Sequence, residues 1–294
     1  MTDVPYVIAL HGGAGVIPGR DYGRALDHLR DLAARMSSEL AVGLAAIDAV
    51  EIAVAEMEDS GLFVAGRGSA PNAAGVVEMD ASIMDGARHR AGAVCALQGI
   101  ASPVGAARQV LEATPHVLLA GEGAGLFARE RGLPLIGDPA SFYRTPVGLT
   151  QEDIDAEAAA LAHGTVGAVA LDRQGALAAA TSTGGVFGKR PGRVGDTPLP
   201  GAGVWADGEV AVSCTGVGEY FILGATAYDV TARLRYGGQS LDEACQGAIA
   251  RIGELGGDGG LIAVNRQGRV SFQFNSPGLK RAVAGAGQVA MAMI

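Results

Sequence analysis

The organisation of this chain is decided by residues 164–185, which read GTVGAVALDRQGALAAATSTGG. Two apolar runs in this stretch flank Asp172-Arg173-Gln174-Gly175, a turn-forming sequence typical of an antiparallel β-hairpin. Such a hairpin places Thr165, at the start of its first strand, beside Thr181–Thr183, at the polar end of its second strand. We therefore expect hydroxyl groups to gather at one end of a buried hairpin.

Thr165 directly follows Gly164, and this pair predicts self-cleavage. If the bond between them is cut, Thr165 becomes an N-terminus whose hydroxyl is a nucleophile and whose freed α-amine is the base. The unperturbed pKa of such an amine is about 7.7–8.0, so much of it is neutral at a pH of about 7.5. The hydroxyl of Thr183 can hydrogen-bond this nucleophile. Taken alone, Thr165 is simply a β-branched residue at a strand start, and its neighbouring motifs favour the catalytic interpretation.

Downstream loops supply charged groups and amide donors. Arg193 and Asp196 lie in a Pro/Gly-rich loop, residues 191–196. A guanidinium suits a carboxylate and a carboxylate suits an ammonium, so this pair can hold the head group of an amino acid. A salt bridge within a solvated loop is the alternative. Thr215 and Gly216 end an apolar strand, where a hydroxyl and a backbone N–H can form an oxyanion hole; the alternative is a simple strand-to-helix turn.

Composition excludes several classes of protein. The net charge of −9, without any Lys/Arg-rich run, argues against nucleic acid as a partner. Three cysteines, Cys95, Cys214 and Cys245, are too few and too scattered for a disulfide framework or a zinc site, so we expect buried, inert thiols. The first residues lack the features of a signal peptide, and the most apolar stretch is too short and too acidic for a membrane span. We expect a cytoplasmic protein.

Apolar periodicity predicts the remaining elements. Strands are expected at residues 6–10, 76–84, 92–97, 117–120, 166–171, 176–182, 203–206, 210–214, 261–264 and 270–274. Helices are expected at residues 22–57 (one or two), 102–113, 123–131, 219–236 and 240–254. Residues 133–164 are expected to form a surface linker with one helix at residues 151–163. Two sheets packed face to face, with helices outside, would bury these strands.

Ordered motifs along nearly the whole chain resemble the plant-type L-asparaginase/isoaspartyl aminopeptidase family of N-terminal-nucleophile hydrolases. These motifs are residues 11–15, 78–86, 114–117, 121–124, 163–172, 181–185, 191–196, 213–219 and 256–260. The resemblance implies an α+β fold of the αββα sandwich type. It also implies autoproteolysis between Gly164 and Thr165. The products would be an α-chain of residues 1–164 and a β-chain of residues 165–294, within one structural domain and assembled as a homodimer of cleaved pairs.

The resemblance further implies roles for individual residues. The implied catalytic residues are the nucleophile Thr165, its support Thr183, and Thr215 with Gly216 as the oxyanion hole. The implied substrate-binding residues are Arg193 and Asp196, helped by the Gly218 backbone. His11, Gly12 and Gly13 would belong to a glycine-rich loop linked to self-cleavage. We expect a structural role for His11, because an N-terminal threonine supplies its own base.

No catalytic cofactor is implied by the resemblance. A structural sodium ion is implied on the backbone carbonyls of Met57, Glu58, Ser60, Phe63, Ala65 and Arg67. Carbonyl oxygens suit such a hard cation.

One departure from the family pattern bears on activity. The family usually has asparagine near the nucleophile where this chain has Val64, and valine cannot hydrogen-bond. Residues 69–72 also differ from the commoner loop, so we expect a changed leaving-group side.

The main hypothesis is therefore an isoaspartyl (β-aspartyl) dipeptidase in which Thr165 attacks the side-chain carbonyl of a β-linked aspartyl residue. L-Asparagine hydrolysis as the main activity is the close alternative. An uncleaved, non-catalytic protein that binds aspartyl ligands is the alternative from another class. The leaving group, whether arginine, lysine, leucine or ammonia, stays open.

Overall fold

The computed structural model describes residues 5–150, 152–153 and 164–294, and these form two stacked β-sheets with helices on the outer faces. The first sheet has eight strands in the order β12-β11-β1-β5-β6-β2-β3-β4, and the second has four in the order β10-β9-β8-β7. Neighbouring strands are antiparallel throughout, except that β3 and β4 are parallel. The expected αββα sandwich is confirmed.

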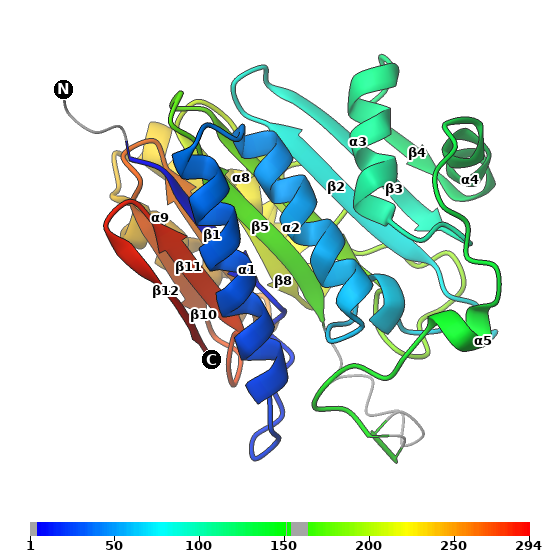
Figure 1. Ribbon diagram of the computed structural model, residues 1–294. Coiled ribbons are helices and arrows are strands. Elements are labelled where there is room, and N and C mark those ends of the chain that lie inside the picture. The colour runs from blue at the N-terminus through cyan, green and yellow to red at the C-terminus, as the bar shows by residue number, and fades with distance from the viewer. Residues whose placement is uncertain (1–4, 151, 154–163) are drawn as a thin grey trace.

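The eight-stranded sheet carries the predicted hairpin at its centre (Figure 1). Its strands are β12 (Gln288–Met293), β11 (Arg281–Gly285), β1 (Val7–His11), β5 (Thr165–Leu171), β6 (Leu177–Thr183), β2 (Met79–Asp85), β3 (Arg90–Leu97) and β4 (Leu118–Ala120). The outer face is covered by α1 (Gly23–Ala41), α2 (Ala46–Ser60), α3 (Pro103–Ala113) and α4 (Gly121–Glu130). Two short helices, η1 (Gly66–Gly68) and α5 (Pro139–Phe142), lie in the connections.

The four-stranded sheet lies behind the first and has its own helical cover. Its strands are β10 (Val270–Phe274), β9 (Gly259–Asn265), β8 (Val210–Gly216) and β7 (Val204–Ala206). The helices are α7 (Gly218–Gly224), α8 (Thr226–Arg235) and α9 (Leu241–Glu254). The single helix expected at residues 219–236 is wrong, because Ala225 has a left-handed backbone (φ 45°) that separates α7 from α8. An isolated left-handed residue of this kind cannot continue a right-handed helix.

Three apolar layers hold the sandwich together. One lies between the eight-stranded sheet and helices α1 to α3, a second between the two sheets, and a third between the four-stranded sheet and helices α8 and α9. In the central hairpin Ala168 and Ala180 face the helices, while Val169 and Ala179 face the other sheet. Both faces of the hairpin are buried, which explains why its strands are apolar at consecutive positions.

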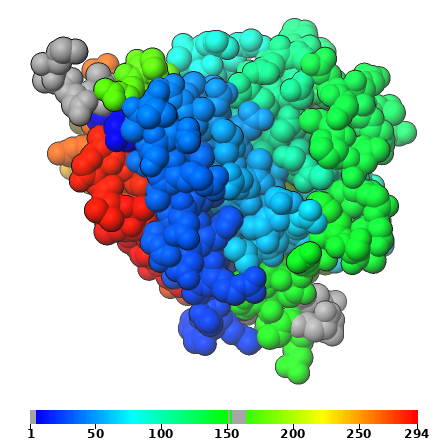
Figure 2. Space-filling model, in the orientation of Figure 1, coloured from blue at the N-terminus to red at the C-terminus, as the bar shows by residue number. Residues whose placement is uncertain are grey.

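Two strands were not predicted. β11 and β12 have short, Ala/Gly-rich sequences, RAVAG and QVAMAM, whose weak β-propensity hides them. β11 nevertheless pairs with β1 along its full length, from Val7–Gly285 to His11–Arg281. Figure 2 shows this C-terminal pair in red at one edge of the face that α1 and α2 cover. The helix expected at residues 151–163 falls on a segment that is largely outside the described residues.

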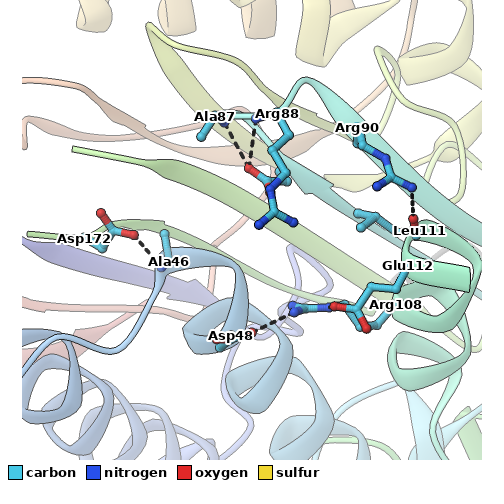
Figure 3. A network of polar contacts seen from close by, with 10 residues as sticks. Ala46, Asp48, Ala87, Arg88, Arg90, Arg108, Leu111, Glu112 and Asp172 are labelled. Carbon is cyan, nitrogen blue, oxygen red and sulfur yellow. Dashed lines mark hydrogen bonds and ion pairs between the residues drawn. The ribbon is translucent and has the colours of Figure 1, made fainter. Parts of the chain in front are cut away.

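The turn of the central hairpin is tied to the helical layer. Asp172 Oδ1 accepts hydrogen bonds from the amides of Gln174 and Ala176, both at 2.9 Å, as the turn sequence predicted. Its Oδ2 accepts the amide of Ala46 at 2.9 Å, at the first turn of α2 (Figure 3). Arg108 of α3 reaches Asp48 of α2 at 2.8 Å. These bonds fix the hairpin against α2 and α3, and so fix where Thr165 lies at its far end.

Among the described helices, none combines the length and the apolar character needed to cross a membrane.

Candidate active site

Thr165 and Thr183 lie opposite each other on adjacent strands, as the hairpin predicted. They are directly paired in the register of β5 and β6, and both are buried, with 6% and 5% of their surface exposed. The hydroxyl of Thr183 donates to the carbonyl oxygen of Gly164 at 3.1 Å and accepts the amide of Gly185 at 3.0 Å. Thr183 therefore polarises the carbonyl of the bond between Gly164 and Thr165.

That bond is tightly enclosed. A Cβ on Gly164 would overlap the side chain of Val64, standing only 2.5 Å from its Cβ. On the other side Gly13, with φ at +94°, brings its Cα close enough that a Cβ there would lie 3.0 Å from Gly164 Cα and 3.1 Å from Thr165 N. Glycine is needed at both places for space, and at Gly13 also for its left-handed backbone.

His11 belongs to a buried polar chain behind the hairpin. Its Nε2 lies 2.8 Å from Ser213 Oγ, which lies 2.8 Å from Thr181 Oγ1. Gly167 leaves room for this chain, because a Cβ there would overlap both His11 and Ser213. Burial lowers the pKa of His11 to about 3, so the ring is neutral and is a poor general base at physiological pH. The geometry agrees with the structural role expected for His11.

A pocket opens beside Thr165 and draws its walls from four segments of the chain. The lining residues are Gly164, Thr165, Thr183, Gly185, Val186, Arg193, Gly195, Asp196, Thr197, Gly216 and Gly218. The structure thus brings together most of the site residues named from the sequence, and we call this the head-group pocket.

Arg193 and Asp196 both line the head-group pocket, yet they do not form the loop salt bridge that was the alternative interpretation. The guanidinium of Arg193 instead donates from Nε and Nη2 to the two carboxylate oxygens of Glu219, at 2.9 and 2.7 Å. Nothing in the sequence indicates that Glu219 pairs with Arg193, because an acidic residue in the first turn of a helix is already favoured by the helix dipole.

Asp196 is a buried carboxylate with an oxygen that can still accept a hydrogen bond. Only 4% of its surface is exposed, and its Oδ2 has no hydrogen-bond partner among the described residues. Burial raises the pKa of Asp196 to about 7, and the nearby Arg193 charge partly opposes that rise. A Cβ on Gly218 would lie 2.9 Å from Asp196 Oδ1, so glycine is required there for space. An ammonium group from a ligand would satisfy this carboxylate.

Thr215 and Gly216 lie at the end of β8, on the far wall. Gly216 lines the head-group pocket, whereas Thr215 is fully buried behind it. The Thr215 hydroxyl accepts the amide of Ala14 at 3.2 Å, which ties the strand end to the glycine-rich loop after β1. Gly216 pairs with Gly259 so closely that a Cβ on Gly216 would lie 2.8 Å from Gly259 Cα. Of the two residues expected to form the oxyanion hole, Gly216 therefore lies at the pocket wall and Thr215 does not line the pocket.

The loop after α2 is tightly turned, and two of its glycines lie against carbonyl oxygens. A Cβ on Gly66 would overlap the Glu58 carbonyl, and a Cβ on Gly68 would overlap the Phe63 carbonyl, so both oxygens point into the turn. The Glu58 carboxylate is committed elsewhere, to Ser102 Oγ at 2.8 Å and Val104 N at 3.0 Å. The described residues contain no group of three or more His, Cys, Asp or Glu side chains arranged for a metal ion.

The three cysteines are free and buried, as expected. Burial raises the pKa of Cys95 to about 11 and that of Cys245 to about 12, and it also raises the pKa of Cys214. The thiols are therefore protonated and unreactive at physiological pH.

Comparison with known proteins places this site in a family. A family model described as asparaginase matches residues 4–294. An isoaspartyl peptidase of Salmonella typhimurium is 44% identical, over 96% of this chain and 96% of the relative. An isoaspartyl peptidase of Escherichia coli is also 44% identical, over 96% and 93%. A plant-type L-asparaginase of Pyrobaculum calidifontis is 41% identical, over 96% and 98%. The chain therefore belongs to the asparaginase family of N-terminal-nucleophile hydrolases.

Proposed function

We propose that this protein is an isoaspartyl (β-aspartyl) dipeptidase whose nucleophile is an N-terminal Thr165 released by autoproteolysis. The observation that carries the proposal is the head-group pocket, which joins the paired Thr165 and Thr183 to Arg193 and Asp196. A nucleophile beside one fixed cation and one fixed anion suits a substrate with a free α-carboxylate and a free α-amine. The names of the related peptidases support the same substrate class.

Self-cleavage begins with attack of the Thr165 hydroxyl oxygen on the carbonyl carbon of Gly164. Negative charge develops on the Gly164 oxygen, where the Thr183 hydroxyl already donates at 3.1 Å. The C–N bond then breaks, the hydroxyl proton ends on the released amine, and an ester joins Gly164 to Thr165. Water hydrolyses this ester and leaves a carboxylate on Gly164 and a free amine on Thr165.

The mature enzyme repeats this chemistry on its substrate. The Thr165 amine takes the hydroxyl proton while the oxygen attacks the side-chain carbonyl of the β-linked aspartyl residue. Charge on the carbonyl oxygen is met by the Gly216 amide, and Thr215, buried behind the pocket wall, holds this strand end in place. The amine of the second residue leaves with the proton from the Thr165 ammonium, and water then releases aspartate from the acyl-enzyme. Arg193 and Asp196 hold the aspartyl head group throughout.

Two measurements test this proposal. Intact mass and N-terminal sequencing of the purified protein should give fragments of 164 and 130 residues, the second beginning with threonine. Steady-state kinetics on β-aspartyl dipeptides should then give a higher kcat/KM than on L-asparagine. A fully cleaved protein that hydrolyses L-asparagine and no β-aspartyl dipeptide would overturn the proposed substrate class.

L-Asparaginase as the main activity is the second candidate. It uses the same residues with ammonia as the leaving group, and the relative from Pyrobaculum calidifontis carries that name. The kinetic comparison above separates the two candidates directly, because both substrates present the same head group.

An uncleaved protein that binds aspartyl ligands without turnover is a third candidate. The observation that favours it is Val64, which offers no hydrogen bond beside the Gly164 carbonyl. A single species of 294 residues that persists for days after purification would support this candidate against the enzyme.

We also propose a structural sodium ion in the loop after α2, held by the carbonyls of residues 57, 58, 60, 63, 65 and 67. The carbonyls of Glu58 and Phe63, which lie against Gly66 and Gly68 in this tight loop, support the site, because carbonyl oxygens suit a hard cation. Exchange of Na⁺ for choline at constant ionic strength should lower the Tm if the ion is bound. An equal Tm in both salts would contradict the proposal.

We propose, finally, that the cleaved protein is a homodimer of α/β pairs. β12 ends the order of the eight-stranded sheet, and Val289, Met291 and Ile294 are exposed on or next to it. An apolar sheet edge of this kind favours burial against a second subunit. Light scattering after size-exclusion chromatography should give twice the mass of one cleaved pair.

A further inference from the structure

A second pocket lies on the other side of Gly164. Gly164 lines both this pocket and the head-group pocket, and in the uncut chain the second pocket is narrow, with room for little more than water-sized groups. Its walls are mainly apolar and include Phe63, Val64, Val147 and Leu149. In the uncut chain Gly164 is therefore the partition between a polar pocket and an apolar one.

One cation is built into this apolar pocket. Lys280 lines it and is only 6% exposed. Its Nζ donates to the carbonyl of Gly15 at 3.3 Å and lies 4.9 Å from the centre of the Tyr22 ring. Among the described residues no carboxylate lies within ion-pair distance of it. Burial lowers the pKa of Lys280 to about 8, which still leaves most of the side chain charged at pH 7.

The position of Lys280 relative to the scissile bond is fixed by the backbone. The amide of Gly12 donates to the Lys280 carbonyl at 2.7 Å, and the amide of Lys280 donates to the Gly13 carbonyl at 3.2 Å. Gly13 is in turn packed against Gly164 and Thr165. A buried ammonium without an anionic partner is costly, and a ligand carboxylate would relieve that cost.

We infer that the second pocket receives the leaving-group residue of the dipeptide, with its apolar side chain against Val64 and Phe63 and its α-carboxylate on Lys280. This inference rests on the proposed dipeptidase function. Cleavage frees the carboxyl end of Gly164 from Thr165, so the partition can move and the two pockets can join beside the nucleophile. A lysine or arginine in the leaving position would meet both apolar walls and a like charge. The site therefore selects an apolar second residue, such as leucine, that has a free α-carboxylate.

The test uses the cleaved enzyme and substrates that share one head group. These are β-aspartyl-leucine, β-aspartyl-leucine amide, β-aspartyl-lysine and L-asparagine. The wild-type kcat/KM for β-aspartyl-leucine should exceed that for its amide by about tenfold or more, because only the free acid pairs with Lys280. The same substrate should be preferred over β-aspartyl-lysine.

Lys280→Met should lose this preference. Its kcat/KM for β-aspartyl-leucine should fall by at least about tenfold more than its kcat/KM for the amide or for L-asparagine. Lys280→Arg keeps the charge and should retain the preference for the free acid. Equal losses on all substrates would assign Lys280 a purely structural role and overturn the inference.

The wild-type comparison of acid and amide needs no variant, so it decides the matter even if Lys280→Met fails to fold. Dipeptide hydrolysis without any dependence on the leaving carboxylate would overturn the inference and leave the proposed function intact. Hydrolysis of L-asparagine without any dipeptide hydrolysis would overturn the proposed function and the inference with it.

Discussion

The two pockets that meet at Gly164 differ in the chemistry of their walls. The head-group pocket is lined by glycines and polar side chains, and it holds a guanidinium and a carboxylate on one loop, Arg193 and Asp196. The second pocket has apolar walls around a single ammonium, Lys280. From this difference we infer that the aspartyl half of a dipeptide is recognised by charge pairing, and the leaving half by apolar burial with one ion pair.

The two pockets also differ in how firmly their lining side chains are fixed by neighbouring residues. Arg193 is fixed by a bidentate pair with Glu219, and Asp196 by close contact with Gly218. The side chain of Val64, by contrast, contributes only through its shape against Gly164, while the Val64 carbonyl accepts the amide of Gly184 at 2.8 Å. We therefore expect substitutions on the head-group side to cost more activity than substitutions on the leaving side.

The largest effect should come from Thr165, the nucleophile in the wall of the head-group pocket. Thr165→Ala removes the nucleophile, so it should block self-cleavage and reduce hydrolysis by at least about 10⁴-fold. Thr165→Ser keeps a hydroxyl and should still be cut. Denaturing electrophoresis and turnover of a β-aspartyl dipeptide measure both outcomes. A cleaved Thr165→Ala protein would show that the nucleophile lies elsewhere.

The next largest effect should come from Gly164, which separates the two pockets in the uncut chain. Gly164→Ala places a methyl group against Val64, 2.5 Å from its Cβ, and so displaces the scissile carbonyl. Misplacement of about 1 Å can cost about 10²-fold in rate, so self-cleavage should slow to that extent. The double variant Gly164→Ala with Val64→Gly removes the Val64 Cβ and with it the side-chain overlap, and should recover most of the rate. Slow cleavage that persists in the double variant would mean that the contact with Val64 is not the cause.

Substitutions of the charge pair should weaken substrate binding without stopping maturation. Arg193→Ala and Asp196→Asn each remove a charge-assisted contact to the head group, which is worth about 1.5–3 kcal/mol, or about 10- to 100-fold in KM. The protein should still cut itself, because Gly164 carries no such head group. Arg24→Ala, on the exposed side of α1, serves as a matched control. An unchanged KM in Arg193→Ala would remove Arg193 from substrate binding.

Local sequence explains why the hairpin was predictable. The turn at Asp172 sets the register of β5 and β6, and this register places Thr165 opposite Thr183. Residues 165–183 alone therefore determine the pairing. The placement of Arg193 and Asp196 in one pocket was predictable for the same reason, because the two residues are only three positions apart in the sequence. The αββα layers followed from strands that are apolar on both faces, together with the family resemblance.

Contacts between distant segments were not predictable in this way. His11 and Ser213 are 202 positions apart, and nothing in the sequence around either residue indicates a contact between them. Lys280 looks like an ordinary surface residue in the sequence, and only the packing of the chain after β10 against the glycine-rich loop buries it. The strands β11 and β12 were missed because alanine and glycine carry little β-propensity, although pairing with β1 makes up for it.

The pH dependence of kcat/KM tests the head-group pocket, because both titrating groups belong to it. Two groups should act in their deprotonated forms: Asp196, whose pKa burial raises to about 7, and the Thr165 amine, with an ordinary pKa of about 7.7–8.0. As the pH falls below 7, Asp196 gains a proton and loses the charge that holds the substrate ammonium. We therefore expect log kcat/KM to fall with a limiting slope of about 2, because each group contributes one proton.

The matched measurement is the profile of Asp196→Asn. This variant has lost one of the two titrating groups, so its kcat/KM should fall with a limiting slope of about 1 at a lower overall rate. A slope of about 1 in the wild-type enzyme would show that Asp196 does not titrate in this range or does not bind the ammonium.

The smallest effect should come from Val64. Val64→Asn places an amide beside the Gly164 position, where it can donate to a carbonyl oxygen, and one such hydrogen bond is worth about 0.5–1.5 kcal/mol. We expect self-cleavage and L-asparagine hydrolysis to rise by about 2- to 10-fold. The same change makes the wall of the second pocket polar, so kcat/KM for β-aspartyl-leucine should rise less or fall. Opposite responses of the two substrates would show that Val64 tunes the leaving side alone, whereas a uniform rise would show that it acts on the reacting carbonyl in both.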